Sequence, residues 1–281
     1  MVLDGRVFGD SITLRPSADT SLFAAFPDNN LGSNPNLVSG ANGSGFPARA
    51  LIRFDVANQI PSNAMIQSAA LTVNVVIVPG GGGVDSTFDL RRVLLDWGEG
   101  IGTGNTGSPA NDGEATWNNR FHPSTPWTVA GGAVSNDFSG TLDASMFING
   151  LGSYTFGPNT NLVADVQQWL LNPATNFGWA LISESENTLF TARRFGSRED
   201  TTNTPILVVQ YALPAEIQWI QAAGNQIQFS FLASGGQPYT VQYRDSLASG
   251  NWLTLTITTT NLIVLDPFPT NVQRFYRIGI F

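Results

Sequence analysis

Cysteine and lysine are both absent from this sequence of 281 residues. Without cysteine the chain has no disulfide, no thiolate metal site and no cysteine nucleophile. Without lysine every one of the 13 basic residues is an arginine, and 21 acidic residues leave a net charge of −8. Nucleic-acid binding requires a basic surface that releases counterions, so we expect no nucleic-acid partner. An anionic membrane surface is disfavoured for the same reason.

Long apolar runs are missing as well. No stretch approaches the roughly 18 continuous apolar residues of a membrane span, so we expect no membrane insertion. The N-terminal MVLDGRVFGD has neither the basic nor the apolar segment of a secretion signal. Asn, Ser, Thr, Gln and 29 glycines supply the polar surface, a balance that suits secreted β-proteins. We therefore expect a mature secreted or cell-surface protein behind an added Met, with an intracellular protein as the alternative.

Short segments in which apolar and polar residues alternate dominate the first 213 residues. The longest, 66–78, alternates as expected of a strand with one buried face. Segment 161–171 instead has apolar residues at helical spacing before a proline, which predicts a short helix that covers the core through Trp169. Segment 26–45 is rich in turn residues and is predicted to be a long connection. The pattern predicts an all-β fold, a jelly-roll-like antiparallel β-sandwich with one short helix.

The pattern changes near Leu213 and Pro214. Six short strand-like segments follow at regular spacing, which predicts a small sandwich of the immunoglobulin or fibronectin kind. We therefore expect two domains, a jelly-roll-like sandwich over 1–213 and a smaller one over 214–281. The stretch 2–8, ahead of the first sandwich, is a candidate donor strand for assembly with another copy.

Acids, amides and tryptophans concentrate at 94–119, around a loop of Gly, Asn and Ser. Carboxylate and carbonyl oxygens are the ligands that Ca²⁺ prefers, so a structural calcium ion is a candidate cofactor. Asp19 and Glu99 are the metal ligands that we favour. No catalytic signature accompanies them: the single histidine, His122, precedes a proline, and no GxSxG motif is present. We expect that the protein is not an enzyme.

Several sequence blocks, in order, resemble the DNRLRE-domain family of bacterial secreted β-sandwiches, which is related to carbohydrate-binding modules. They are SADT (17–20), NLGSNPNL (30–37), RALIRFDV (49–56), IPSNAMIQSAALTV (60–73), DWGEG with TWNN, ADVQQWLLNPATNFGWAL (164–181), and FGSRED before TPILVVQY (204–211). The resemblance implies an extracellular jelly-roll sandwich and, as in the better-understood branch of the family, binding of acidic polysaccharides such as alginate. It does not imply catalysis by this domain. YTVQYRDSLASGNW (239–252) and RFYRIGI (274–280) resemble a fibronectin type III-like module, which implies that Tyr243 and Trp252 pack in its core.

Two kinds of side chain are candidates for sugar binding. Trp97 and Trp117 offer aromatic faces, although burial in the core is the stronger interpretation of both. Arg193, Arg194 and Arg198 form the densest basic cluster of an acidic chain, and an arginine fork matches a carboxylate. Pairing with nearby acids is an equally good interpretation of the three arginines.

These observations predict a non-catalytic extracellular polysaccharide-binding protein, with acidic glycans as the expected partners. The alternative is a structural subunit that self-associates into an extracellular filament, surface layer or matrix. Low charge and apolar strand faces would suit assembly through strand edges.

Overall fold

The strand β6 (Met65–Ile77) is the longest strand in the larger sheet of the protein, which we describe from a computed structural model. Its inward side chains are buried, Leu71, Val73 and Val75 among them. The structure describes residues 10–80, 83–224, 226–232, 238–259, 263–267 and 273–279. The candidate donor strand at 2–8 lies outside the described residues.

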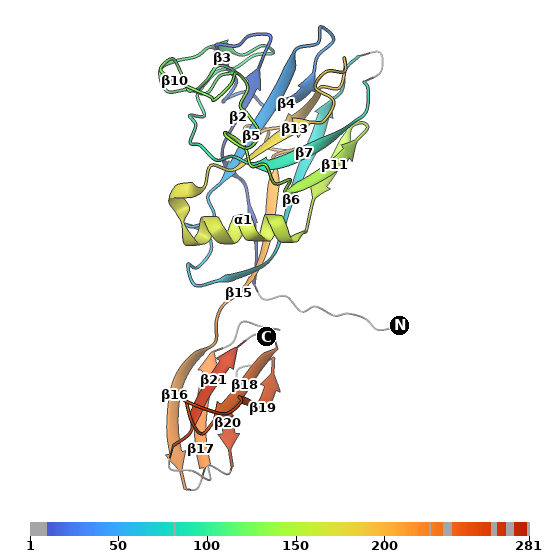
Figure 1. The fold of residues 1–281 in the computed structure, drawn as a ribbon. Helices are drawn as coiled ribbons and strands as arrows, with labels where there is room; N and C mark the ends of the chain where they lie inside the picture. The colour runs from blue at the N-terminus through green and yellow to red at the C-terminus, as the bar shows by residue number, and fades with distance from the viewer. Residues whose placement is uncertain are drawn as a thin grey trace. The chain divides into compact units, whose positions relative to one another are not determined.

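The fold is all-β with one α-helix, as the sequence predicts (Figure 1). Strands of the part before residue 214 are β1 (Asp10–Leu14), β2 (Pro16–Phe23), β3 (Asn29–Asn30), β4 (Asn36–Ala41), β5 (Pro47–Phe54), β6, β7 (Ser86–Arg92), β8 (Ser108–Pro109), β9 (Asn119–Phe121), β10 (Thr125–Pro126), β11 (Ala144–Ile148), β12 (Gly152–Phe156), β13 (Trp179–Ser183), β14 (Arg193–Gly196) and β15 (Ile206–Ala212). The strands that follow are β16 (Glu216–Ala223), β17 (Gln226–Leu232), β18 (Tyr239–Arg244), β19 (Leu253–Thr258), β20 (Ile263–Asp266) and β21 (Phe275–Gly279).

Eleven strands form one curled sheet in the order β1-β15-β6-β14-β4-β5-β13-β7-β11, with β12 on β6 and β2 on β5. The strand β4 joins its two halves, because residues 36–39 pair with β14 while Gly40 and Ala41 pair with β5. The sequence predicts a long connection over 26–45, and β4 lies within it. Three apolar residues of that stretch are buried: Leu31, Leu37 and Val38.

The helix α1 (Thr160–Leu171) begins at Asn159, whose side chain accepts hydrogen bonds from the N–H groups of Asn161 and Leu162. It ends before a short 3₁₀ turn, η1 (Pro173–Thr175). Trp169 is fully buried against Trp179 of β13, with ring centroids 4.4 Å apart. The prediction of a short helix that covers the core through Trp169 is confirmed.

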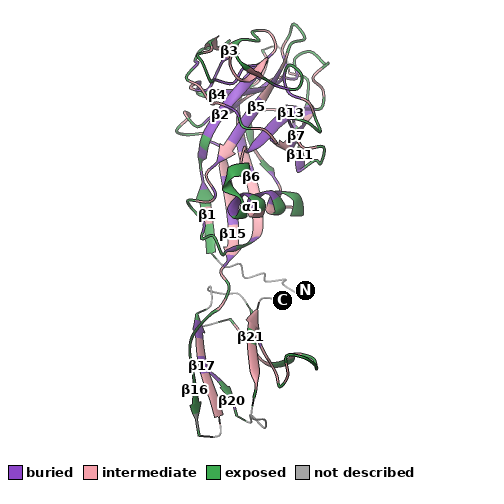
Figure 2. Cartoon of the chain, turned by 60° about the vertical axis from the view of Figure 1, so that its left-hand side comes forward, coloured by how far each residue is buried: buried purple, intermediate pink, exposed green. Residues whose placement is uncertain are grey.

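The structure divides into two compact units, one of residues 13–60 and 68–209, the other of 1–12, 61–67 and 210–281. The C-terminal strands form two three-stranded sheets, β16-β17-β20 and β19-β18-β21. Between these sheets lies a small core of Phe229, Phe231, Tyr239, Val241 and Val264. Figure 2 shows how the buried residues gather along the strands. All six strand-like segments predicted after residue 214 are strands in the structure.

Candidate functional site

The two candidate tryptophans lie in or against a core cluster, not on an open face. Trp97 is 1% exposed, its Nε1 donates to the carbonyl of Phe177 at 2.9 Å, and the Arg53 guanidinium covers its ring at 5.0 Å. Trp117 is half-buried against the same cluster, with the Arg49 guanidinium 5.6 Å from its ring centroid. Trp97 therefore has no face free to stack on a sugar ring. It is a core residue, which is the interpretation that the sequence favours.

Arg193 is the second candidate that the structure places in the interior. Its side chain has no exposed surface, and its NH1 group donates to the carbonyls of Phe190, Thr191 and Ala192 at 3.2–3.4 Å. Its NH2 group donates to the carbonyl of Val84 and lies 3.3 Å from an oxygen of Asp85. A guanidinium so enclosed ties loops together and offers no edge to a polysaccharide, which corrects its assignment as a ligand-binding residue.

Arg194 follows on β14, so its side chain points to the opposite face of the strand. It lines an apolar pocket of about 270 Å³ formed at the ends of β2, β4, β6 and β14. The walls are mainly apolar and include two phenylalanines, Phe23 and Phe190, with Asn42 as a polar neighbour. Burial lowers the pKa of Arg194.

The Phe190 wall of this pocket has an unusual backbone. Its φ is +64°, a left-handed conformation that is rare for a bulky residue and that recurs at functional sites. The ring sits close to Gly43, where a Cβ atom would lie only 2.5 Å from the ring atom Cε1. A glycine at position 43 is therefore required for the ring to take its place in the pocket.

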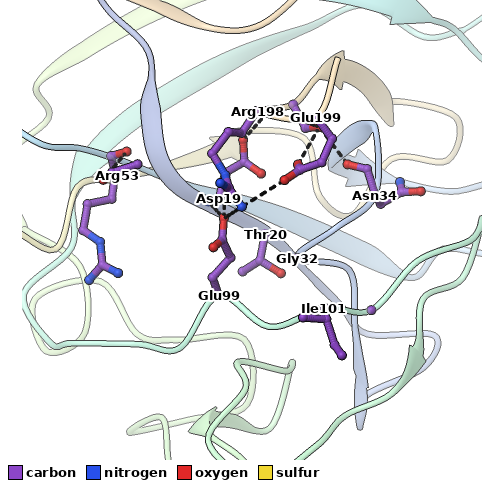
Figure 3. Close-up of polar contacts among 12 residues, drawn as sticks. Asp19, Thr20, Gly32, Asn34, Arg53, Glu99, Ile101, Arg198 and Glu199 are labelled. Carbon is purple, nitrogen blue, oxygen red and sulfur yellow. Dashed lines mark hydrogen bonds and ion pairs between the residues drawn. The ribbon is translucent and has the colours of Figure 1, made fainter. Parts of the chain in front are cut away.

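Arg198 lies in a different cluster, which also contains both candidate metal ligands (Figure 3). Glu99 Oε1 accepts from the Asp19 N–H at 2.8 Å and lies 3.0 Å from the Arg198 guanidinium. The N–H of Arg198 donates to Asp19 Oδ2 at 2.7 Å, and its guanidinium also pairs with Glu199 at 3.0 Å. The three arginines predicted as one patch thus have three separate sets of partners.

Burial dominates the electrostatics of this cluster. It raises the pKa of Asp19 to about 8, even though the Arg198 N–H acts in the opposite direction. Burial also raises the pKa of Glu99, against the hydrogen bond from the Asp19 N–H. One oxygen of Asp19, Oδ1, is buried and accepts no hydrogen bond from the described residues. At neutral pH a protonated Asp19 fits this environment better than a carboxylate does.

Asn30 connects the cluster to the loop after β7. Its Nδ2 donates to the carbonyls of Glu99 and Ala115, and its Oδ1 accepts from the N–H groups of Gly32 and Gly102. Added Cβ atoms at the surrounding glycines would lie 2.3 Å or less from neighbouring atoms, which explains the glycines at positions 32, 100 and 102: Gly32 between β3 and β4, and Gly100 and Gly102 in the loop after β7. The sequence does not predict this role of Asn30, because the role depends on loops that meet only in the folded chain.

A calcium site does not emerge from these contacts. Asp19 and Glu99 meet through a backbone N–H, and the positive charge beside them is Arg198. Among the described residues no group of three or more His, Asp or Glu side chains is arranged to hold a metal ion. The calcium ion therefore stays a prediction from the sequence.

A second buried acid pair lies beneath the helix. Asp165 accepts from Trp179 Nε1 at 2.9 Å and pairs with Arg92 at 3.1 Å, and Asp143 accepts from the Arg92 N–H at 2.6 Å. Burial, together with the neighbouring Asp165, raises the pKa of Asp143 to about 7. Both acids are at most 5% exposed, so they join α1 to the sheet and lie away from solvent.

Comparisons with known proteins add little to this description. No family model and no curated protein matches the chain. A solved structure of allantoicase is similar over 83% of this chain and 73% of that chain, at 9% identity and a TM-score of 0.13, which carries no argument. No helix in the described part of the chain is long and apolar enough to cross a membrane.

Proposed function

We propose that this chain is a non-catalytic extracellular polysaccharide-binding protein that binds an acidic sugar in the Arg194 pocket. The observation that carries the proposal is that the Arg194 guanidinium lines an apolar pocket with no salt bridge to a described residue. Of the five N–H donors of an arginine, the described residues use one, which bonds to the Asn105 carbonyl at 3.0 Å. Arg193 and Arg198, by contrast, have carboxylate partners.

An anionic ligand would complete the electrostatics of this pocket. Removal of a guanidinium from water is unfavourable unless an opposite charge accompanies it, and a carboxylate accepts two parallel hydrogen bonds from an arginine fork. Phe190 is 42% exposed, and an aromatic ring can stack against the C–H groups of a sugar. A volume of about 270 Å³ suits one sugar ring more than a longer segment.

Binding of galacturonate and of polygalacturonate tests this proposal, with glucose and dextran as neutral controls. Wild type should bind the acidic forms, and Arg194→Gln should weaken binding about tenfold or more, since charge-assisted hydrogen bonds contribute about 1.5–3 kcal/mol. Arg15→Gln is the matched control, because Arg15 is exposed and the substitution removes the same charge. Equal affinity of Arg194→Gln and Arg15→Gln, or no binding by wild type, contradicts the proposal.

Self-association into an extracellular assembly is the second candidate function, and the strand β19 favours it. β19 reads LTLTIT and stands at one end of its sheet, paired with β18. It has no charge and no proline, and Leu253 and Ile257 are 53% and 63% exposed. Natural proteins protect such edges with charge or proline. Sedimentation velocity at increasing concentration tests the idea with Thr256→Lys as the variant, and a wild type that stays monomeric contradicts it.

A further inference from the structure

The outer face of the sheet β19-β18-β21 carries a cluster of two arginines and one tryptophan. The guanidinium carbons of Arg244 and Arg277 lie 4.6 and 4.5 Å from the centroid of the Trp252 ring, which holds the two charges within about 9 Å of each other. The resemblance to a fibronectin type III-like module implied a core position for Trp252. The structure instead places it half-buried against arginines, outside the core cluster of the module.

Strand alternation explains why the arginines face outward. Tyr239 and Val241 of β18 are buried in the module core, so Arg244 lies on the other face. On β21 the half-buried Tyr276 and Ile278 pack against the same core, so Arg277 between them also faces outward. The register pairs Gln242 with Arg277, and Gln242 Oε1 accepts from Arg277 Nε at 2.7 Å.

The charge distribution makes this face distinct within an acidic protein. Residues 214–281 contain three arginines and three acids, whereas residues 1–213 contain 10 arginines and 18 acids. The strands β18, β19 and β21 themselves contain no acid. Asp245 and Asp266 both bind Arg274, at 2.8 and 2.7 Å. The formal net charge of −8 therefore comes entirely from the first 213 residues, and the charged side chains within these three strands, Arg244 and Arg277, are both positive.

We infer that the Arg244–Trp252–Arg277 face is a second binding surface for a linear polysaccharide that carries carboxylates. Stacking against one indole restricts both guanidinium groups, so less side-chain entropy is lost when they bind carboxylates. Two charges so spaced match a polymer with repeated anions better than a single sugar acid. This inference rests on the proposed function, since it assigns the same class of ligand to a second place in the chain.

A polymer carries many carboxylates, so each surface can bind it independently of the other. The Arg194 pocket would select the sugar acid, and the Arg244–Trp252–Arg277 face would retain the polymer. A monosaccharide occupies the pocket alone, so the two ligands separate the contributions of the two surfaces.

The test measures galacturonate and polygalacturonate binding by wild type, Arg244→Gln/Arg277→Gln, Arg194→Gln and the control Arg15→Gln. The double variant should lose at least tenfold in affinity for the polymer and keep wild-type affinity for the monosaccharide. Arg194→Gln should lose the monosaccharide. If the double variant does not fold, Arg277→Gln alone serves, because Arg277 is exposed and its substitution leaves the core intact.

The two proposals fail in different ways. Polymer binding by the double variant equal to that of Arg15→Gln overturns the second surface and leaves the pocket standing. Polymer binding that is lost in the double variant but unchanged in Arg194→Gln overturns the pocket and leaves the second surface standing. A single-stranded oligonucleotide that binds this face as tightly as polygalacturonate overturns the assignment to polysaccharide.

Discussion

The Asp19 cluster and the Arg194 pocket lie in the same unit and differ in the partners of their charged side chains. In the cluster, Arg198 and backbone N–H groups bind the carboxyl groups of the acids, so the site is largely complete without a ligand. In the pocket, Arg194 is surrounded by apolar walls with one hydrogen bond to a carbonyl. A group of charged side chains whose partners all lie within the protein therefore has a structural role. A charged side chain that lacks such a partner is the better candidate for ligand binding.

The largest expected difference in stability is that between substitutions of the two neighbouring arginines of β14. Arg193→Met removes hydrogen bonds from a fully buried guanidinium to four carbonyls, so we expect the free energy of unfolding to fall by about 3 kcal/mol or more. Arg194→Met should change it by less than about 1 kcal/mol, because an apolar side chain suits the pocket. Urea denaturation measures both values. Equal losses of stability in the two variants would contradict the distinction between an enclosed Arg193 and an Arg194 that faces a pocket.

The Asp19 cluster should show an intermediate effect that depends on pH. The folded protein holds a proton on Asp19 up to about pH 8, whereas the ordinary pKa is 3.8, so stability should fall as pH rises between these values. Asp19→Asn removes this loss. It should therefore equal wild type near pH 4 and exceed it by about 1 kcal/mol or more at pH 8, as measured by urea denaturation at each pH.

Asp200→Asn is the control of opposite sign. Although burial acts to raise it, hydrogen bonds from Asn203 and Thr202 hold the pKa of Asp200 below its ordinary value. Its stabilisation is present at neutral pH and is lost as pH falls, so Asp200→Asn should be the less stable protein at pH 8. An Asp19→Asn variant that loses stability at pH 8 would show that the Asp19 carboxylate is needed in its charged form.

The smallest expected effect is that of added calcium on thermal stability. Because Arg198 supplies the positive charge beside Asp19 and Glu99, millimolar CaCl₂ should shift the melting temperature by less than about 1 °C relative to EDTA. Magnesium at the same concentration controls for ionic strength. A calcium-specific rise of several degrees that disappears in Glu99→Gln would establish the calcium site predicted from the sequence.

Local patterns in the sequence were enough to predict much of the fold. Alternation identified β6 and the six C-terminal strands, and helical spacing identified α1 with Trp169 as its buried residue. The sequence pattern does not predict β4, β11 and β12 as strands. In β4, residues such as Ser39 and Gly40 suggest a turn, and the segment becomes a strand because β14 and β5 supply its hydrogen-bond partners.

The candidate site was predictable only in part. Four blocks quoted for the family resemblance, SADT, NLGSNPNL, DWGEG and FGSRED, do meet in one cluster, through Asp19, Asn30, Glu99 and Arg198. The sequence identified these residues as polar and closely spaced within each block. It did not show that Arg198 would be the internal partner of the two acids, since that contact joins positions 99 residues apart.

The sequence by itself determined the composition of charge, the all-β class and the positions of most strands, because these depend on residue types and short-range periodicity. Only the tertiary structure decided which arginine faces a ligand. Arg193 and Arg194 are identical in type and adjacent in the chain, and alternation alone places them on opposite faces. Which face is filled by carbonyls and which opens into an apolar pocket depends on segments near residues 40, 80 and 105, which packing brings to β14.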